Sequence, residues 1–187
     1  MRFLIVVDAQ NDFIDGALRN EEAIKRVPNI VKEIKEGDWN AIIATQDTHY
    51  SNDYLDTAEG RKLPIPHCIK GSEGWKINKE VLDAIQTTTE NFAILEKSTF
   101  GSFALANILV DYFEEGRRSG IEPDNEDLYI ELVGFCTDIC VISNALIVKT
   151  MIEMGAVAVK ESCCAGVTKE SHDTALKAMQ ACHIDIV

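Results

Sequence analysis

Three reactive side chains follow short apolar runs in this sequence. Asp8 ends the first run, Lys97 follows a later one, and Cys140 comes a few residues after another. A cysteine becomes an effective nucleophile when a base takes its proton and a cation stabilises the charges that result. Asp8 could accept the thiol proton and Lys97 could stabilise both anions, so these residue types suit nucleophilic catalysis.

Cys140 lies near the start of an expected helix. Thr137 or Asp138 would serve as the N-cap, with an apolar helical stripe behind it. Free N–H groups and the helix dipole in the first turn favour a thiolate. A buried structural role is the common alternative for a cysteine, but the available base and lysine favour the nucleophile.

A second group of residues has the character of metal ligands. Asp47 and His49 lie two apart directly after an apolar run, and this spacing allows both to hold one divalent ion. Glu59 and His67 lie further along the same irregular stretch, which extends from residue 46 to about 78. Long irregular stretches inside a domain are usually functional, and a metal would supply order there.

The elements that must position these side chains alternate along the chain. Short β-branched runs predict strands, and longer runs with a helical period predict helices. The expected strands are residues 3–7, 41–45, 92–95, 128–133, 156–159 and 184–187. The expected helices are residues 21–35, 79–86, 103–113, 138–154 and 169–181, with a charged loop over 114–127.

This alternation predicts a single three-layer, doubly wound α/β domain over residues 1–187. Its sheet would be mostly parallel, with about six strands and helices on both faces. Ligands of such sheets bind beyond the carboxyl ends of the strands, near a switch in strand order. The acid, the metal-type pair, the lysine and the thiol are all expected at that one rim.

Composition excludes several classes of protein. Of 187 residues, 46% are hydrophobic and 26% charged, as in ordinary globular proteins and unlike disordered or collagen-like chains. The net charge of −13 argues against nucleic acid and anionic membranes as partners. The apolar runs are too short to span a bilayer, and the opening reads as a buried strand rather than a secretory signal. Six cysteines without a spaced framework indicate free thiols in the cytoplasm.

Five ordered blocks of the sequence carry a likeness to a known family. They are residues 7–13, 46–49, 66–68, 97–103 and 134–141. Together they resemble the isochorismatase-like cysteine hydrolases, the superfamily that includes nicotinamidases. The likeness covers nearly the whole chain and includes a closing stretch over residues 165–176.

The resemblance implies a catalytic triad with Cys140 as nucleophile, Asp8 as general base and Lys97 as its charged partner. It also implies a cis peptide bond between Phe135 and Cys136. The backbone N–H groups of Cys136 and Cys140 would then face the developing oxyanion. The reaction implied is thiolate attack on an amide, release of ammonia, and hydrolysis of the thioester by water.

The resemblance also implies a divalent metal ion, expected to be zinc, with iron or manganese as alternatives. Asp47, His49 and His67 match its ligands residue by residue. Relatives commonly have a second His six residues after the first, but Leu55 stands at that position here. Some relatives use a Glu instead, and Glu59 is the nearest candidate.

The expected substrate is nicotinamide, whose ring nitrogen the metal would hold, and the protein is expected to be a homo-oligomer. Phe13 and Phe100 would form apolar walls of the pocket, while Pro64 replaces a ring-stacking aromatic of nicotinamidases. Another small amide, a carbamoyl compound or isochorismate is the alternative substrate.

Two other classes of function compete with this interpretation. Asp8 could be the nucleophile of a phosphoryl transfer, but Gln10 stands where a second carboxylate for magnesium would be expected. A redox-sensing binding domain would use the adjacent Cys163 and Cys164, which we interpret instead as strand-end residues. The remaining histidines, His172 and His183, are interpreted as structural.

Overall fold

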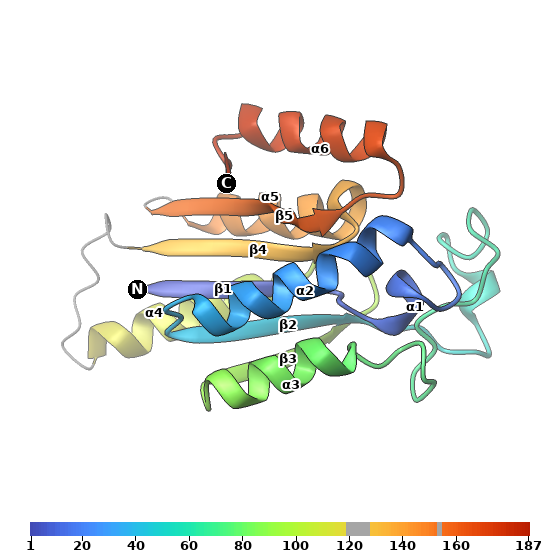
Figure 1. Cartoon of the computed structure of the whole chain (residues 1–187), viewed down its shortest axis with the longest axis horizontal. Coiled ribbons are helices and arrows are strands. Elements are labelled where there is room, and N and C mark those ends of the chain that lie inside the picture. The colour runs from blue at the N-terminus through green and yellow to red at the C-terminus, as the bar shows by residue number, and fades with distance from the viewer. Residues whose placement is uncertain (119–127, 153–154) are drawn as a thin grey trace.

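The computed structural model describes residues 1–118, 128–152 and 155–187, and only the backbone of residues 115–118. Six strands form one sheet at its centre (Figure 1). They are β1 (Arg2–Val7), β2 (Ala41–Asp47), β3 (Phe92–Lys97), β4 (Tyr129–Phe135), β5 (Ala156–Ala165) and β6 (Asp185–Ile186). Every pairing between neighbouring strands is parallel. Most residues of β1, β2 and β4 are buried, as expected for strands covered on both faces.

The strand order is β3-β2-β1-β4-β5-β6. The chain moves outward from β1 to β3 and then returns to β4 on the other side of β1, so the strand order switches between β1 and β4. In Figure 1 the segments that follow β1 and β2 gather at one end of the sheet. This architecture confirms the predicted doubly wound α/β fold.

Helices cover both faces of the sheet. They are α1 (Asn11–Ile14), α2 (Glu21–Glu36), α3 (Lys79–Thr88), α4 (Phe103–Arg118), α5 (Ile142–Met151) and α6 (Lys169–Ala181). Apolar side chains of α1, α2 and α3 pack in one core cluster, and those of α4, α5 and α6 pack in a second. Asn20 caps α2 through its side-chain oxygen, which accepts hydrogen bonds from the N–H groups of Glu22 and Ala23.

The structure corrects several predicted boundaries. Strand β5 continues to Ala165, because its end pairs with β4 although the polar residues 160–162 interrupt its apolar pattern. Helix α4 continues to Arg118, so the predicted charged loop over 114–127 starts late and otherwise lies outside the described residues. The helix predicted over 138–154 ends at Met151, and residues 153–154 lie outside the description.

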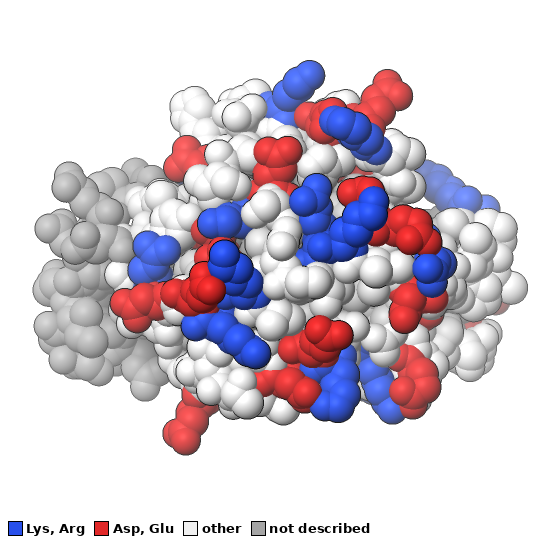
Figure 2. Space-filling view, viewed as in Figure 1, with Lys and Arg blue, Asp and Glu red and all other residues white. Residues whose placement is uncertain are grey.

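The surface carries charges of both signs. On the face shown in Figure 2, acidic and basic side chains are interspersed rather than segregated. Some form exposed pairs within one helix, such as Lys25 and Glu22 on α2. Among the described residues, none of the helices is both long enough and apolar enough to span a membrane.

Candidate active site

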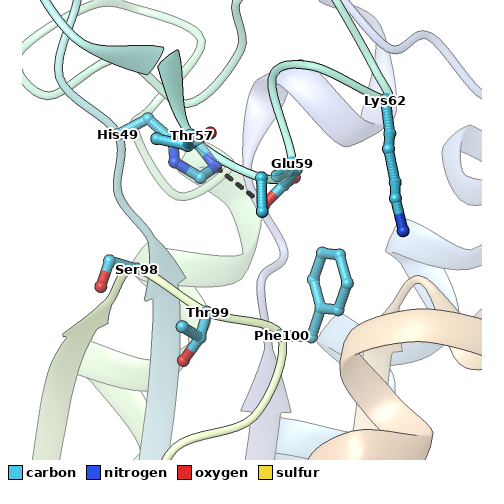
Figure 3. A pocket seen from close by; sticks show the side chains of 8 residues that line it. His49, Thr57, Glu59, Lys62, Ser98, Thr99 and Phe100 are labelled. Atoms are coloured by element: carbon cyan, nitrogen blue, oxygen red, sulfur yellow. Dashed lines mark ion pairs between the residues drawn. The ribbon is translucent and has the colours of Figure 1, made fainter. Parts of the chain in front are cut away.

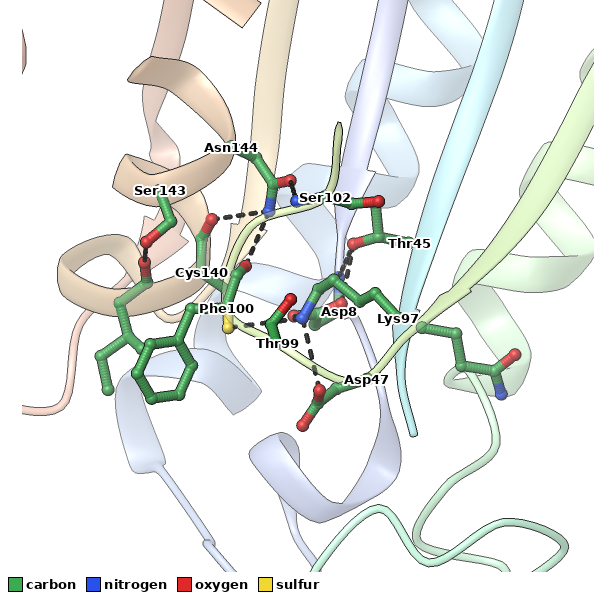
Figure 4. Close-up of polar contacts among 12 residues, drawn as sticks. Asp8, Thr45, Asp47, Lys97, Thr99, Phe100, Ser102, Cys140, Ser143 and Asn144 are labelled. Atoms are coloured by element: carbon green, nitrogen blue, oxygen red, sulfur yellow. Dashed lines mark hydrogen bonds and ion pairs between the residues drawn. The ribbon is translucent and has the colours of Figure 1, made fainter. Parts of the chain in front are cut away.

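The switch point brings together side chains from four parallel strands (Figure 4). Asp8 directly follows β1, Asp47 and Lys97 end β2 and β3, and Cys140 follows β4. All four are buried, with Asp8 completely enclosed. Parallel strands bring their carboxyl ends to one edge, so residues far apart in the sequence meet here.

The Lys97 ammonium lies at the centre of this group. Its Nζ is 2.6 Å from Asp8 Oδ2, 3.4 Å from Asp47 Oδ1 and 3.7 Å from Cys140 Sγ. The structure therefore brings together the acid, the amine and the thiol that were singled out in the sequence. One buried cation contacts both the candidate base and the candidate nucleophile.

The backbone at Asp8 turns sharply to direct the carboxylate inward. Asp8 has a φ of 46°, which is uncommon for a residue other than glycine and is typical of functional turns. The Thr45 hydroxyl donates a hydrogen bond of 2.7 Å to Asp8 Oδ1. Gly134 on neighbouring β4 has a φ of 120°, and a Cβ there would collide with the Val7 carbonyl. The strand ends can approach closely only with glycine at that position.

Cys140 lies in a π-helical turn, Thr137–Val141, that precedes α5. The expected caps were wrong. The helical turn already begins at Thr137, so Cys136 is the N-cap residue, and no side chain caps the turn. The Thr137 hydroxyl instead lies 2.8 Å from His172 Nδ1, and Asp138 accepts a hydrogen bond from the Val167 N–H. The peptide bond between Phe135 and Cys136 is cis, as the family resemblance implies.

Asn144 fixes the position of this turn. Its side chain is fully buried and donates to the carbonyls of Cys140 and Phe100, at 2.8 and 3.1 Å. Its oxygen accepts a hydrogen bond of 3.0 Å from the Ser102 N–H. Sequence reasoning missed this residue, although an asparagine within a strongly apolar helix was a signal that could have identified it.

Burial and neighbouring charges determine the protonation states. Burial raises the pKa of Asp8 above its ordinary value of 3.8, although the Lys97 ammonium opposes this shift. Burial and the Asp8 charge raise the pKa of Cys140 well above 9.0. For Lys97, burial acts to lower the pKa, but the charges of Asp8, Cys140 and Asp47 outweigh it and raise the pKa. These shifts favour a neutral thiol and a protonated lysine in the resting site, against the expectation of a thiolate favoured by the helix dipole.

A second cluster lies beside this group, on the other side of Asp47. The ligand atoms of Asp47, His49, Glu59 and His67 all lie within 4.8 Å of one another. His49 Nε2 is 3.0 Å from Asp47 Oδ2, and His67 Nε2 is 3.4 Å from Glu59 Oε1. The structure therefore places Glu59 with the other three residues that the sequence indicated.

The donor set of this cluster fits a divalent metal ion. Two imidazoles and two carboxylates suit zinc and also iron or manganese. His49 Nε2 is buried and faces the carboxylate oxygens of Asp47 and Glu59, at 3.0 and 3.8 Å, as expected for donor atoms that converge on one metal ion. His67 Nδ1 lies 2.9 Å from the Ile65 carbonyl, an interaction that leaves Nε2 as the donor atom toward the cluster.

Both clusters open onto one cavity of about 730 Å³. Phe13 and Phe100 form part of its wall, together with Cys136 and Cys140. A volume of this size is typical of small-molecule sites. Of the two positions that differ from the family pattern, Leu55 is 56% exposed and Pro64 is also exposed, while Leu63 lines the cavity.

A smaller pocket of about 360 Å³ is lined in part by His49 and Glu59 of the metal-type cluster (Figure 3). His49, Glu59 and Phe100 line it together with Lys62, Ser98 and Thr99. The dashed line in Figure 3 marks the contact of 3.8 Å between His49 Nε2 and Glu59 Oε2. Residues of the metal-type cluster thus line both hollows.

Comparison with known proteins identifies the family. The model of the isochorismatase domain matches residues 2–187. The chain belongs to the isochorismatase family. Membership confirms the resemblance seen in the sequence, and the nicotinamidases among the relatives indicate the predicted enzyme class, an amidohydrolase.

Relatives and solved structures agree with this membership. The "Uncharacterized isochorismatase family protein PncA" of Bacillus subtilis is 32% identical over 152 residues, which cover 76% of this chain and 75% of that protein. The crystal structure of a nicotinamidase/pyrazinamidase of Bacillus subtilis matches with a TM-score of 0.77 at 25% identity and covers 100% of this chain and 98% of its own. The pyrazinamidase of Pyrococcus horikoshii in complex with zinc matches with a TM-score of 0.73 at 25% identity, with the same coverage of both chains.

Proposed function

We propose that this protein is a metal-dependent cysteine amidohydrolase that converts nicotinamide and water to nicotinate and ammonia. One observation carries the proposal: a buried acid–amine–thiol group and a cluster of four potential metal ligands open onto the same cavity. The likeness to nicotinamidases and pyrazinamidases supports this substrate class.

The chemistry of the triad follows from its protonation states. As Cys140 Sγ attacks the amide carbon, its proton moves to Asp8, whose raised pKa makes it a better base than an ordinary carboxylate. Asp8 then protonates the amide nitrogen, the C–N bond breaks, and ammonia leaves a thioester on Cys140. Water attacks the thioester, Asp8 takes the water proton and returns it to sulfur, and the carboxylic acid product leaves.

Two further groups stabilise charge during these steps. Lys97 remains protonated and compensates the negative charge that passes between Cys140 and Asp8. We assign the oxyanion hole to the backbone N–H groups of Cys136 and Cys140, at the start of the helical turn, where such groups have no intrahelical partner.

Asp47, His49, Glu59 and His67 would hold the metal ion. When bound, a divalent ion at this position would supply a Lewis acid that binds the ring nitrogen of a pyridine carboxamide. Phe13 and Phe100 would contact the faces or edges of the ring, since both line the cavity between the two clusters. The ring would thus be oriented with its amide toward Cys140.

We also propose that the enzyme works in the cytoplasm as a homo-oligomer. All six cysteines are free thiols, a pattern that suits a reducing compartment. The homo-oligomer is proposed from the family resemblance, and size-exclusion chromatography with light scattering tests it directly.

Ammonia release from nicotinamide tests the main proposal. We expect activity in the wild type supplied with zinc, iron or manganese, a loss of more than 10³-fold in Cys140→Ala, and a large loss after chelation that added metal restores. Activity that survives chelation would indicate a metal-free hydrolase. A wild type inactive on nicotinamide but active on a carbamoyl compound would refute the substrate, and activity retained in Cys140→Ala would refute the mechanism.

A further inference from the structure

Gln10 makes an unusual set of contacts with one candidate metal ligand. It is fully buried in the turn between β1 and α1. Its Oε1 accepts a hydrogen bond of 2.7 Å from the Asp47 N–H, and its Nε2 donates to the Asp47 carbonyl at 2.8 Å. The same Nε2 donates to the Trp75 carbonyl, also at 2.8 Å. One side-chain amide therefore binds both backbone polar groups of Asp47.

Asp12, two residues further on, holds the segment that carries another candidate ligand. Its Oδ2 accepts a hydrogen bond of 2.7 Å from the N–H of Cys68, the residue after His67. The Cys68 carbonyl in turn accepts a hydrogen bond of 3.0 Å from the His49 N–H. The Asp12 carboxylate packs so closely against Gly74 that a Cβ at that position would collide with it. Asp12 therefore fixes the backbone that brings His67 next to His49.

The roles assigned so far to the turn after β1 do not explain these contacts. Asp8 serves the triad and Phe13 lines the cavity, whereas in the described structure the hydrogen bonds of the Gln10 and Asp12 side chains go to neither the thiol nor the Lys97 ammonium. The Gln10 side chain binds the backbone of Asp47, and the Asp12 side chain binds the backbone of Cys68, which adjoins His67. Groups that orient metal ligands commonly contribute 10–100-fold to metal affinity.

We infer that Gln10 and Asp12 are positioning residues of the metal centre, which set the geometry of Asp47 and His67 through hydrogen bonds to their backbone segments. This inference rests on the proposed function, because it requires that the cluster binds a metal. It assigns one short turn to both halves of the site: Asp8 provides the base, and Gln10 and Asp12 prepare the metal centre.

Asn144 provides a matched control within the same molecule. Like Gln10, it is a fully buried side-chain amide that makes three hydrogen bonds to backbone groups. Its partners, however, belong to Cys140, Phe100 and Ser102, on the thiol side of the cavity. Loss of Asn144 should therefore disturb the nucleophile and not the metal ligands.

The test is zinc affinity, measured by competition with a chromophoric chelator on protein freed of metal by dialysis. Gln10→Met keeps the side-chain volume and removes all three hydrogen bonds. Asp12→Asn keeps the shape but replaces one of the two accepting oxygens, which bind the N–H groups of Cys68 and Ala17, by an NH2 group that cannot accept. We expect zinc to bind 10–100-fold more weakly to Gln10→Met and several-fold more weakly to Asp12→Asn. Asn144→Leu should stay within about twofold of the wild type. His49→Ala lacks one candidate ligand and therefore shows how much zinc binds outside this site. Thermal melting in the presence of chelator shows whether each variant folds.

The possible outcomes separate the two proposals. Wild-type zinc affinity in both Gln10→Met and Asp12→Asn overturns the inference and leaves the proposed function intact. An equal loss in Asn144→Leu also overturns it, because the effect would then be a general loosening of the site. If Gln10→Met does not fold, Asp12→Asn decides the question. A wild type that binds no more zinc than His49→Ala refutes the metal centre itself, and the inference fails with it.

Discussion

Replacement of Lys97 by methionine removes a buried charge that two carboxylates share. The side chain of Lys97 is 2% exposed, and its Nζ lies 2.6 Å from Asp8 and 3.4 Å from Asp47. At an effective dielectric constant of about 20, each attraction is on the order of 5–6 kcal/mol, and desolvation offsets much of it. Removal of one partner from a buried pair typically costs about 3–5 kcal/mol. We therefore expect the free energy of unfolding of Lys97→Met to fall by about 3–5 kcal/mol, or roughly 6–20 °C in Tm.

Urea unfolding in the presence of a chelator measures this loss without a contribution from bound metal. A double-mutant cycle with Asp8→Asn should give a coupling of about 2 kcal/mol or more, because the neutral amide introduced by that substitution no longer needs the ammonium. Lys25→Met is the matched control: Lys25 lies 2.7 Å from Glu22, but the two side chains are 67% and 56% exposed. Exposed pairs contribute little, so this variant should lose less than about 0.5 kcal/mol.

The reasoning would be refuted by a loss in Lys97→Met below about 1 kcal/mol, or by strictly additive effects in the cycle. Either result would mean that Asp8 is protonated in the resting protein and does not rely on the ammonium. Asp8 would then be unable to accept the proton of Cys140, and the order of proton transfers in the proposed mechanism would have to be reversed.

Three further predictions follow from the site and its supports. Asp8 must be ionised to accept the thiol proton, and burial raises its pKa, so a pH–rate profile should show kcat/KM falling at low pH with an apparent pKa above 3.8. An apparent pKa at or below 3.8 would contradict this. Glu131 is buried on β4, and burial raises its pKa above 4.5; the stability it contributes is present below pH 4.5 and is lost as pH rises through the higher folded-state value. Urea unfolding between pH 5 and 8 should therefore show Glu131→Gln gaining stability relative to the wild type as pH rises, and a constant difference would refute the assignment. Phe100 is 45% exposed and lines the cavity, so Phe100→Ala should raise KM about tenfold, a loss of about 1.4 kcal/mol in binding free energy, and leave Tm nearly unchanged. An unchanged KM would exclude contact between Phe100 and the substrate.

The sequence predicted the fold because its signals were local. Runs such as residues 41–45 are β-branched and apolar, and each is followed by polar residues that mark a strand end. The same logic located Asp8, Asp47 and Lys97 at one rim, since parallel strands bring their carboxyl ends together. Cys140 required only that the fourth strand end near residue 133, which the structure extends to Phe135.

Features that depend on the surroundings could not be predicted in this way. The helix dipole suggested a thiolate at Cys140, but burial and the Asp8 charge reverse the direction of the pKa shift. Glu59 could be only the nearest candidate, because the closure of its irregular loop on His67 depends on contacts distant in the sequence. Gln10 was noted as part of a sequence block, yet its role became visible only when β2 placed Asp47 within its reach.

Asp47 connects the two halves of the site. One of its oxygens lies 3.4 Å from Lys97 Nζ, and the other lies 3.0 Å from His49 Nε2. Its charge raises the pKa of Asp8 and of Cys140, so any change in that charge also alters the readiness of the thiol to lose its proton. Because Gln10 fixes the backbone of Asp47, the geometry of the metal centre and the electrostatics of the triad depend on the same carboxylate. In the proposed mechanism, substrate orientation and thiol activation are therefore coupled through Asp47, and the turn after β1 contributes to both, through Gln10 and Asp8.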